Sequence, residues 1–324
     1  MTNALLLACV AFVLMAPWGH SLVEALLKRG IGKRIREDEP DAHQVKQGTA
    51  TMGGLYFLAG AIALAIALAL GGHAQVLLVL LAMLLFGLLG AYDDLRGLKD
   101  VSGVGWLARF KFSWQWIVAI VVSLVMYWAW PEHRLILPIS GRALELGWWF
   151  IPIAALLMVY EANAVNLTDG MDGLAGGAAA IAYLAYGVLC GFSGQDGLAL
   201  FCFGFAGALC AFLWFNVHPA RMFMGDVGSQ SLGAGLAAAA MLSGHWLLLF
   251  VIGVVFLAEA LSVMIQVSWF KYTKRKYGEG RRVFRMSPLH YHYELGGWSE
   301  VQVTLRFWIV TALAAALGIA LGIG

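Results

Sequence analysis

The chain is short of charge. Its 324 residues include only 21 Lys and Arg and 19 Asp and Glu, whereas a soluble globular chain of this length carries roughly 80 charged side chains. The apolar set makes up 61% of the residues, and the mean hydropathy is +0.79. These values exclude a disordered chain, a nucleic-acid binder built on a basic surface and an ordinary cytosolic enzyme. They leave a polytopic membrane protein.

Cysteine is also scarce, with four residues in the chain. Cys9, Cys190, Cys202 and Cys210 all lie in apolar stretches, with no CxxC pair and no His beside them at metal-ligand spacing. We therefore expect them to be small buried hydrophobic side chains.

Long apolar runs are abundant instead. About 200 apolar residues would fill about ten membrane spans of about 20 residues each. The runs lie at residues 3–27, 51–70, 76–92, 112–130, 148–165, 174–192, 197–215, 228–243, 246–270 and 301–323. No basic residue precedes Lys28, so we expect a retained first helix and not a cleaved signal peptide. The sequence predicts an all-α, polytopic membrane fold of about ten spans, with residues 1–324 forming a single transmembrane catalytic domain.

Basic residues are distributed unequally between the two sets of connections. If the spans alternate, one side receives residues 28–50, 93–111, 166–173, 216–227 and 271–300. With the start of the last span, these segments hold 19 of the 21 Lys and Arg. By the positive-inside rule this side is cytoplasmic and both termini are extracytoplasmic. The long extracytoplasmic connection, residues 131–147, is expected to form a small hairpin or loop.

Two of the five polar clusters on the cytoplasmic side precede the middle of the chain. Residues 36–54, REDEPDAHQVKQGTATMGG, join an acidic run, His43 and Lys46 to a Gly- and Thr-rich turn. That turn could direct N–H groups and an ammonium at an anion, or Thr51 could simply cap the next helix. The pair Asp93-Asp94 ends the third span; its mutual repulsion suggests a divalent cation, a basic partner or proton transfer, although acids can also flank a span.

The next two clusters carry acids among amides and glycines. In NAVNLTDGMDGLAGG, residues 163–177, Asp169 and Asp172 share a face if the chain is helical, and could bind a base, a sugar or a metal; a helix cap is the alternative. In FNVHPARMFMGDVGSQSLG, residues 215–233, glycines on both sides of Asp226 suit a metal-phosphate site. Phe223 could stack on a base or only anchor the membrane interface.

The fifth cluster, residues 271–300, joins a basic run to FRMSPLHYHYELGGWSE. The basic run is typical of a contact with anionic lipid headgroups. His290 and His292 could hold a phosphate, and the lack of a third His or Cys ligand nearby argues against zinc. Glu259, inside the ninth span, indicates either a buried partner or a side chain that reaches the interface.

Together the clusters indicate phosphate chemistry at the cytoplasmic membrane surface. No comparable polar cluster is expected within a span, which argues against a transporter with a midplane site. Carboxylates beside Lys and Arg suit Mg²⁺, which takes one or two carboxylates and completes its shell with water and phosphates. An apolar body with such a face implies a lipid substrate that meets a soluble one.

Six segments carry a family resemblance. GTATMGG, GAYDDLRG, ARFKFSWQ, NAVNLTDGMDGLAGG, FLWFNVHPARMFMGDVGS and FRMSPLHYHYELGGWSE resemble, in order and spacing, the motifs of the phospho-N-acetylmuramoyl-pentapeptide transferase (MraY) family, within the polyprenyl-phosphate N-acetylhexosamine-1-phosphate transferases. The match runs from about Lys33 to the last span. It implies transfer of phospho-MurNAc-pentapeptide from its UDP carrier to undecaprenyl phosphate at the bacterial inner membrane, giving lipid I and UMP, and it suggests a homodimer. A UDP-GlcNAc:polyprenyl-phosphate transferase is the alternative enzyme, and a transporter or inactive cell-wall scaffold the alternative outside enzymes.

The resemblance also implies roles for individual residues. Asp226 would be the Mg²⁺ ligand, and Asp93 and Asp94 would serve the attacking lipid phosphate or its proton. Catalytic positions would further include Lys111, His290 and His292. The nucleotide pocket would be lined by Lys46, Thr51, Asn166, Asp169, Asp172, Asn216 and Phe223, with Phe223 under uracil. A lipid phosphate is already anionic near neutral pH, which favours direct attack over an aspartyl-phosphate intermediate.

The chain departs from the family pattern at three places. Tyr291 stands in the middle of a motif that usually reads His-His-His, so that residue is not carried over as a phosphate ligand. Gly97 replaces a Lys, and Ala50 replaces the Pro of GTPTMGG.

Overall fold

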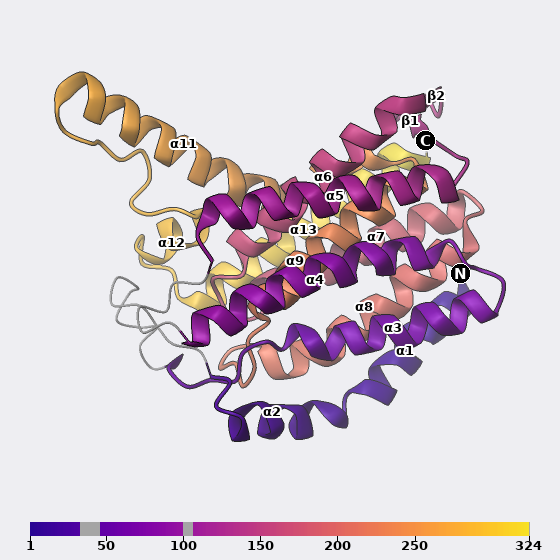
Figure 1. Ribbon diagram of the computed structural model, residues 1–324, viewed down its shortest axis with the longest axis horizontal. Coiled ribbons are helices and arrows are strands. Elements are labelled where there is room, and N and C mark those ends of the chain that lie inside the picture. The colour runs from indigo at the N-terminus through magenta and orange to yellow at the C-terminus, as the bar shows by residue number, and fades with distance from the viewer. Residues whose placement is uncertain (33–45, 100–105, 324) are drawn as a thin grey trace.

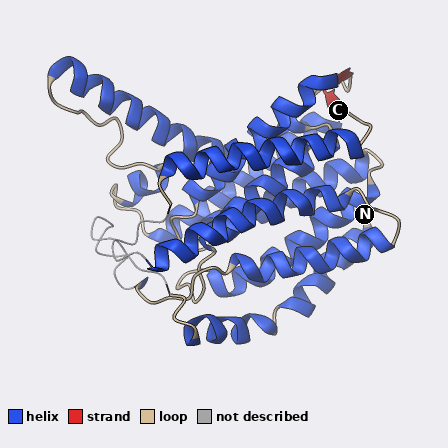
Figure 2. Cartoon of the chain, in the orientation of Figure 1, coloured by secondary structure: helices blue, strands red, loops and turns tan. Residues whose placement is uncertain are grey.

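The computed structural model describes residues 1–32, 46–99 and 106–323. This part of the chain is helical apart from one short hairpin (Figures 1 and 2). In chain order the elements are α1 (Thr2–Met15), α2 (Trp18–Lys28), α3 (Gly54–Leu70), α4 (Val76–Lys99), α5 (Ala108–Ala129), β1 (Arg134–Ile136), β2 (Ala143–Glu145), η2 (Gly147–Trp149), α6 (Phe150–Thr168), α7 (Leu174–Phe192), α8 (Asp196–Asn216), α9 (Gly225–Ser243), η3 (Trp246–Leu248), α10 (Leu249–Ile252), α11 (Val254–Tyr277), α12 (Leu289–Glu294) and α13 (Glu300–Ile323).

The helices confirm a polytopic membrane protein. Among the described residues, seven helices are long and apolar enough to cross a membrane, or eight if α1 and α2 count as one bent span. Each of the ten apolar runs is helical over most of its length, but α3 has only 17 residues and α9 begins with the polar sequence GDVGSQS. The expected hairpin at residues 131–147 is confirmed, since β1 and β2 pair antiparallel with Leu135 opposite Leu144.

Two predicted spans are not continuous helices. The first breaks at Pro17, and α1 and α2 meet at an angle of 45°. Proline lacks the N–H that a helix interior requires, so the expectation of one helix over residues 3–27 is wrong. The ninth is interrupted at Gly253, between α10 and α11.

Two other helices run beyond their apolar stretches. α4 continues to Lys99, so Asp93 and Asp94 lie on a helix and not in a loop. α11 continues through the basic run to Tyr277, where Gly278 ends it with a φ of +80°. Lys and Arg are good helix formers and project into water, so charge alone does not end a helix. The basic end of α11 leans away from the bundle (Figure 1).

α9 lies at the centre of the bundle. Every residue from Val227 to Ser243 is buried, and the helix packs against α3, α4, α6 and α7. Its small Gly, Ala and Ser side chains let neighbouring backbones approach closely, as in other membrane bundles. A Cβ added to Gly90 of α4 would lie 2.2 Å from the carbonyl oxygen of Asp226, so a larger residue there would push the two helices apart.

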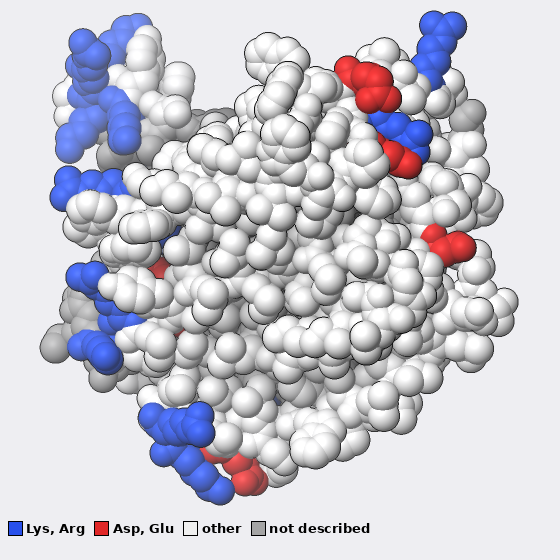
Figure 3. All heavy atoms as spheres, turned by 45° about the vertical axis from the view of Figure 1, so that its right-hand side comes forward, with Lys and Arg blue, Asp and Glu red and all other residues white. Residues whose placement is uncertain are grey.

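Most Lys and Arg side chains lie at the end of the molecule opposite the chain termini (Figures 1 and 3). On the visible face, most Lys and Arg side chains lie at one end of the molecule, and the middle is almost free of charged side chains (Figure 3). Both termini lie at the other end, away from α12 (Figure 1). The expectation of buried cysteines holds for Cys190 and Cys202 but is wrong for Cys9 and Cys210, which are exposed on outer faces of α1 and α8.

Candidate active site

Asp94 joins α4 to the beginning of α9. Its two carboxylate oxygens accept hydrogen bonds from the backbone N–H groups of Asp226 and Val227, each at 3.0 Å. The first N–H groups of a helix have no partner within it and carry partial positive charge, so a carboxylate is a favourable cap. The sequence led us to expect Asp94 at the lipid phosphate or its proton; in this structure both of its oxygens face the start of α9.

Lys111 connects two other carboxylates. From the first turn of α5, its ammonium donates to Asp93 Oδ2 at 3.0 Å and also to Asp226 Oδ2. The backbone N–H of Trp106 donates to the second oxygen of Asp93. The lysine is mostly buried, with 17% of its side chain exposed. One ammonium thus holds together Asp93 of α4 and Asp226 of α9, which lie 133 residues apart in the sequence.

Asn166 holds the other side of Asp226. Its side-chain N–H₂ donates to Asp226 Oδ1 at 2.7 Å and to Ser229 Oγ at 2.8 Å. Asn166 lies in the last turn of α6, so the carboxylate is fixed from a third helix. We call Asp93, Asp94, Lys111, Asn166 and Asp226 the carboxylate cluster.

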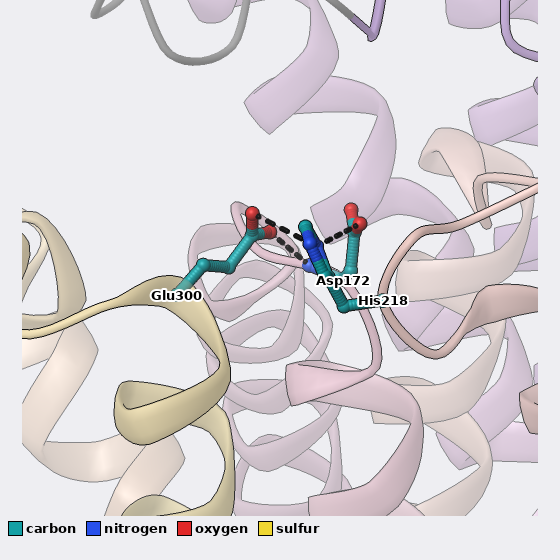
Figure 4. Close-up of side chains that lie close together, drawn as sticks. All are labelled: Asp172, His218 and Glu300. Carbon is teal, nitrogen blue, oxygen red and sulfur yellow. Dashed lines mark hydrogen bonds and ion pairs between the residues drawn. The ribbon is translucent and has the colours of Figure 1, made fainter.

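A second cluster lies around Asp172, in the connection between α6 and α7. The Lys46 ammonium donates to Asp172 Oδ1 at 2.7 Å and also to Glu300 at the start of α13. His218 Nδ1 lies 3.0 Å from Asp172 Oδ2 and 3.4 Å from Glu300 Oε2 (Figure 4). The backbone N–H of Asp172 donates to Glu300 at 2.7 Å. We call Lys46, Asp172, His218 and Glu300 the lysine cluster.

The lysine cluster stabilises the charged form of Asp172. Burial by itself would raise the pKa of the Asp172 carboxyl. The hydrogen bond and charge of Lys46, with further hydrogen bonds from the N–H of Ala220 and from His218, outweigh burial and hold this pKa below its usual value. Asp172 is therefore an anion at neutral pH, positioned from several elements at once.

Phe223 lies beside the lysine cluster, with the Lys46 ammonium 5.9 Å from its ring centroid. The N–H of Phe223 donates to the carbonyl of Ala50, and its own carbonyl accepts from Gly53. Asn216 is buried: its amide oxygen accepts from the N–H of Gly173 at 3.2 Å, and its amide N–H₂ donates to the carbonyl of Met222 at 2.9 Å. Asn216 thus joins the connection before α7 to the connection before α9.

Glu259 binds the histidine segment. Of the two alternatives that the sequence left open for this acid, the structure shows the buried partner. Glu259 is fully buried and accepts from the N–H groups of Leu289, at 2.6 Å, and His290, at 3.2 Å. His290 Nδ1 lies 3.2 Å from the same carboxylate, and its ring packs against Gly170 beside Asp169. His290 is fully buried, whereas His292 is partly exposed and accepts from the N–H of Arg285.

Two further predicted positions can be placed. Asp169 follows the last residue of α6, three residues before Asp172, and is partly buried. The N–H of Thr51 donates to Ile31, and this contact brings the Gly- and Thr-rich turn back onto the chain after α2. The acidic run and His43 of the first cluster lie outside the described residues.

Sequence reasoning missed Glu300 and His218. His218 lies in the polar cluster of residues 215–233 and Glu300 in that of residues 271–300, but only the tertiary fold brings them to Asp172. The expectation that no span holds a polar cluster is wrong as well, because the buried amides Gln115 and Gln230 are hydrogen-bonded to each other between α5 and α9. Isolated amides in apolar runs give no periodic signal.

Among the described residues, two places could hold a divalent cation. Asp172, His218 and Glu300 offer ligand atoms within 4.8 Å of one another, but the Lys46 ammonium already contacts both carboxylates and leaves about one negative charge. The carboxylate cluster brings three carboxyl groups together with one lysine, whose ammonium contacts Asp93 and Asp226. Mg²⁺ prefers such an oxygen-rich set, so the residues around Asp226 fit the ion better than those around Asp172.

Comparisons with known proteins show which proteins the chain is similar to. Residues 76–244, which include the carboxylate cluster, match the model of glycosyl transferase family 4. A phospho-N-acetylmuramoyl-pentapeptide-transferase of Chloroflexus aurantiacus (strain ATCC 29366 / DSM 635 / J-10-fl) is 47% identical over 333 residues, covering 100% of this chain and 90% of the relative. One of Chloroflexus aggregans (strain MD-66 / DSM 9485) is 46% identical over 332 residues, with the same coverage.

Proposed function

The chain belongs to the phospho-N-acetylmuramoyl-pentapeptide transferase family, and on this premise we propose how its two clusters share the reaction. It is a multi-pass enzyme of the bacterial membrane that transfers phospho-MurNAc-pentapeptide from UDP-MurNAc-pentapeptide to undecaprenyl phosphate. The products are lipid I and UMP. A new P–O bond forms between a lipid phosphate oxygen and the sugar-bearing phosphorus, and the bond from this phosphorus to UMP breaks.

In this proposal the lysine cluster and Phe223 bind the uridine end of the donor. Phe223 presents a ring on which uracil can stack. Lys46 is held beside that ring by Asp172 and Glu300 and can meet the donor's phosphates. Asp169, Thr51 and Asn216 complete the pocket, Asn216 by fixing its loops. The supporting observation is that Lys46 contacts Asp172, Glu300 and Phe223, which come from distant parts of the sequence.

The carboxylate cluster is proposed as the place of phosphoryl transfer. Asp226 would hold Mg²⁺, with Asn166 fixing one carboxylate oxygen and Asp94 fixing the helix from which it projects. When bound, the ion supplies positive charge to the donor's diphosphate. Lys111 can turn from the carboxylates to a phosphate oxygen, and Asp93 keeps that lysine at the site by accepting from its ammonium. The attacking oxygen is already anionic, so no residue need remove a proton, and catalysis consists of positioning and charge stabilisation.

The histidine segment lies at the edge of this surface, with His290 fixed by Glu259. Here we propose that α12 positions Asp169 through the packing of His290 on Gly170, and that His292 provides the exposed imidazole of the pair.

We further propose ten spans, with α3 and α9 crossing inside the bundle, the catalytic face cytoplasmic and both termini extracytoplasmic. The whole chain then forms a single transmembrane catalytic domain. A homodimer is proposed from the family alone, and native mass spectrometry in detergent tests it.

The donor is the point at which the two candidate enzymes differ. Detergent-purified protein with undecaprenyl phosphate and Mg²⁺ should release UMP from UDP-MurNAc-pentapeptide and not from UDP-GlcNAc, and EDTA should abolish the release. Release from UDP-GlcNAc alone would assign the chain to the sister activity. Transport into proteoliposomes without UMP formation would favour the non-enzymatic alternative.

A further inference from the structure

Three amide side chains form a continuous hydrogen-bonded chain directly beneath Asp226. Gln230 Nε2 of α9 donates to Asp226 Oδ2 at 3.2 Å. Gln115 Nε2 of α5 donates to Gln230 Oε1 at 3.1 Å, and Asn163 Nδ2 of α6 donates to Gln115 Oε1 at 2.9 Å. Gln115 and Gln230 are fully buried. We call these three residues the amide tier.

The amide tier repeats the carboxylate cluster one helical turn deeper in the bundle. Gln230 follows Asp226 by four residues, Gln115 follows Lys111 by four, and Asn163 precedes Asn166 by three. Residues at these spacings share a helix face. α5 and α9 begin at the catalytic face and α6 ends there. All three amides therefore lie farther from this face than Lys111, Asp226 and Asn166 do.

The direction of every hydrogen bond in the tier follows from the charge of Asp226. An ionised carboxylate only accepts, so Gln230 must present its N–H₂ to it and its carbonyl oxygen to Gln115. Gln115 is then fixed in the same sense, and Asn163 ends the chain by also donating to the carbonyl of Val159 at 2.7 Å. Turning any one amide over would place like groups face to face, so the chain has one satisfied arrangement.

We propose that the amide tier positions the carboxylate of Asp226, and that Gln230 is the residue through which the tier acts on it. Lys111 and Gln230 share Oδ2 of this carboxylate, the lysine from the α5 start and the amide from within α9. When Lys111 turns to a substrate phosphate, Gln230 keeps the carboxylate in its orientation. The tier also holds α5, α6 and α9 in register, so the three helices that carry Lys111, Asn166 and Asp226 keep their spacing during turnover.

If the amide tier only joined the helices, its loss would change neither the affinity for the metal ion nor kcat. The inference rests on the proposed function and on Asp226 as the ion's ligand. It is therefore tested with Mn²⁺ binding, followed by electron paramagnetic resonance, alongside UMP release. Gln230→Met keeps the size of the side chain and removes its hydrogen bonds. We expect kcat to fall about tenfold, Mn²⁺ to bind several-fold more weakly, and KM for the nucleotide donor to change little.

Gln195→Met is the matched control. Gln195 donates to the carbonyl of Ser243, at the opposite end of the same helix α9, so its loss should affect folding at most and leave Mn²⁺ binding and kcat unchanged. Gln115→Met is the second test variant, because it removes the donor to Gln230 and should change kcat and Mn²⁺ binding in the same direction but less. If Gln230→Met does not fold, the comparison of wild type with Gln115→Met tests the proposal. The double variant should be no worse than Gln230→Met.

The outcomes separate the two proposals. If wild-type protein releases no UMP from UDP-MurNAc-pentapeptide, the proposed function fails. If wild-type protein is active and binds Mn²⁺, but Gln230→Met matches it in both, the positioning role is refuted. A loss of the same size in Gln195→Met would also refute it, since the effect would then be general weakening of the bundle.

Discussion

Asp94 caps the helix that carries Asp226: the two residues are 132 positions apart, and the N–H of Asp226 donates to the Asp94 carboxylate at 3.0 Å. This contact makes the orientation of the proposed metal ligand depend on α4. Asp94→Ala should therefore lower the free energy of unfolding by about 1–2 kcal/mol, the usual value of a helix cap, and abolish most activity. Asp94→Asn keeps one acceptor oxygen and should retain more of both.

Thermal unfolding and UMP release of the two variants test this role. If Asp94→Asn is as stable as wild type but as inactive as Asp94→Ala, the carboxylate acts chemically and not as a cap.

Glu300 should affect donor binding more than turnover. In Glu300→Gln the Lys46 ammonium keeps only Asp172 as an anionic partner, and the N–H of Asp172 keeps an oxygen acceptor. We expect KM for UDP-MurNAc-pentapeptide to rise several-fold with kcat within about twofold, because only the placement of Lys46 changes. Steady-state kinetics measure both constants, and the exposed Glu279→Gln is the control. A fall in kcat at constant KM would place Glu300 in the chemical step.

The lysine cluster should make stability depend on acid pH. Because the pKa of Asp172 is lowered in the folded protein, the unfolded chain takes up this proton first as pH falls. The stabilisation is complete above the ordinary Asp pKa of about 3.9 and is lost as pH falls through the lower folded value. The Tm advantage of wild type over Asp172→Asn should thus be constant from pH 7 to 5 and shrink at lower pH. An advantage that grows towards acid pH would contradict this sign.

Glu259 should be essential for the histidine segment. Glu259→Ala leaves the buried N–H groups of Leu289 and His290 without an acceptor, at a cost of about 2–4 kcal/mol. Glu259→Gln keeps an acceptor and should lose less. Protease cleavage in residues 278–288 should become faster in Glu259→Ala, and unchanged cleavage would show that α12 is held by other contacts.

The topology is tested by cysteine labelling in intact cells. After Cys9 and Cys210 are replaced by Ser, a cysteine at the exposed Ser140 in the hairpin should react with a membrane-impermeant maleimide, and one at the exposed Glu279 should react only after permeabilisation. The reverse pattern would invert the proposed orientation.

Much of the site could be predicted from the sequence because its acids stand out against an apolar background. Asp93, Asp94 and Asp226 interrupt hydrophobic runs on the same predicted side, and the structure places them in one cluster with Lys111 and Asn166. The hairpin of β1 and β2 was likewise indicated by its turn residues.

The rest depends on tertiary packing. Gln115 and Gln230 are uncharged and isolated in apolar runs, so only the fold reveals that they meet. Glu300 could equally have been a first-turn acid favoured by the helix dipole. α9 is central but its polar beginning lowers its hydropathy, and the break at Pro17 follows from one residue within an otherwise continuous run.

The central claim is that phospho-MurNAc-pentapeptide transfer takes place at the carboxylate cluster with Asp226 holding the ion. The most direct measurement compares UMP release and Mn²⁺ binding in wild type and Asp226→Asn, which preserves side-chain shape. The account predicts that Asp226→Asn remains folded, loses nearly all UMP release from UDP-MurNAc-pentapeptide and binds Mn²⁺ far more weakly. Normal turnover and normal Mn²⁺ binding in Asp226→Asn would contradict it.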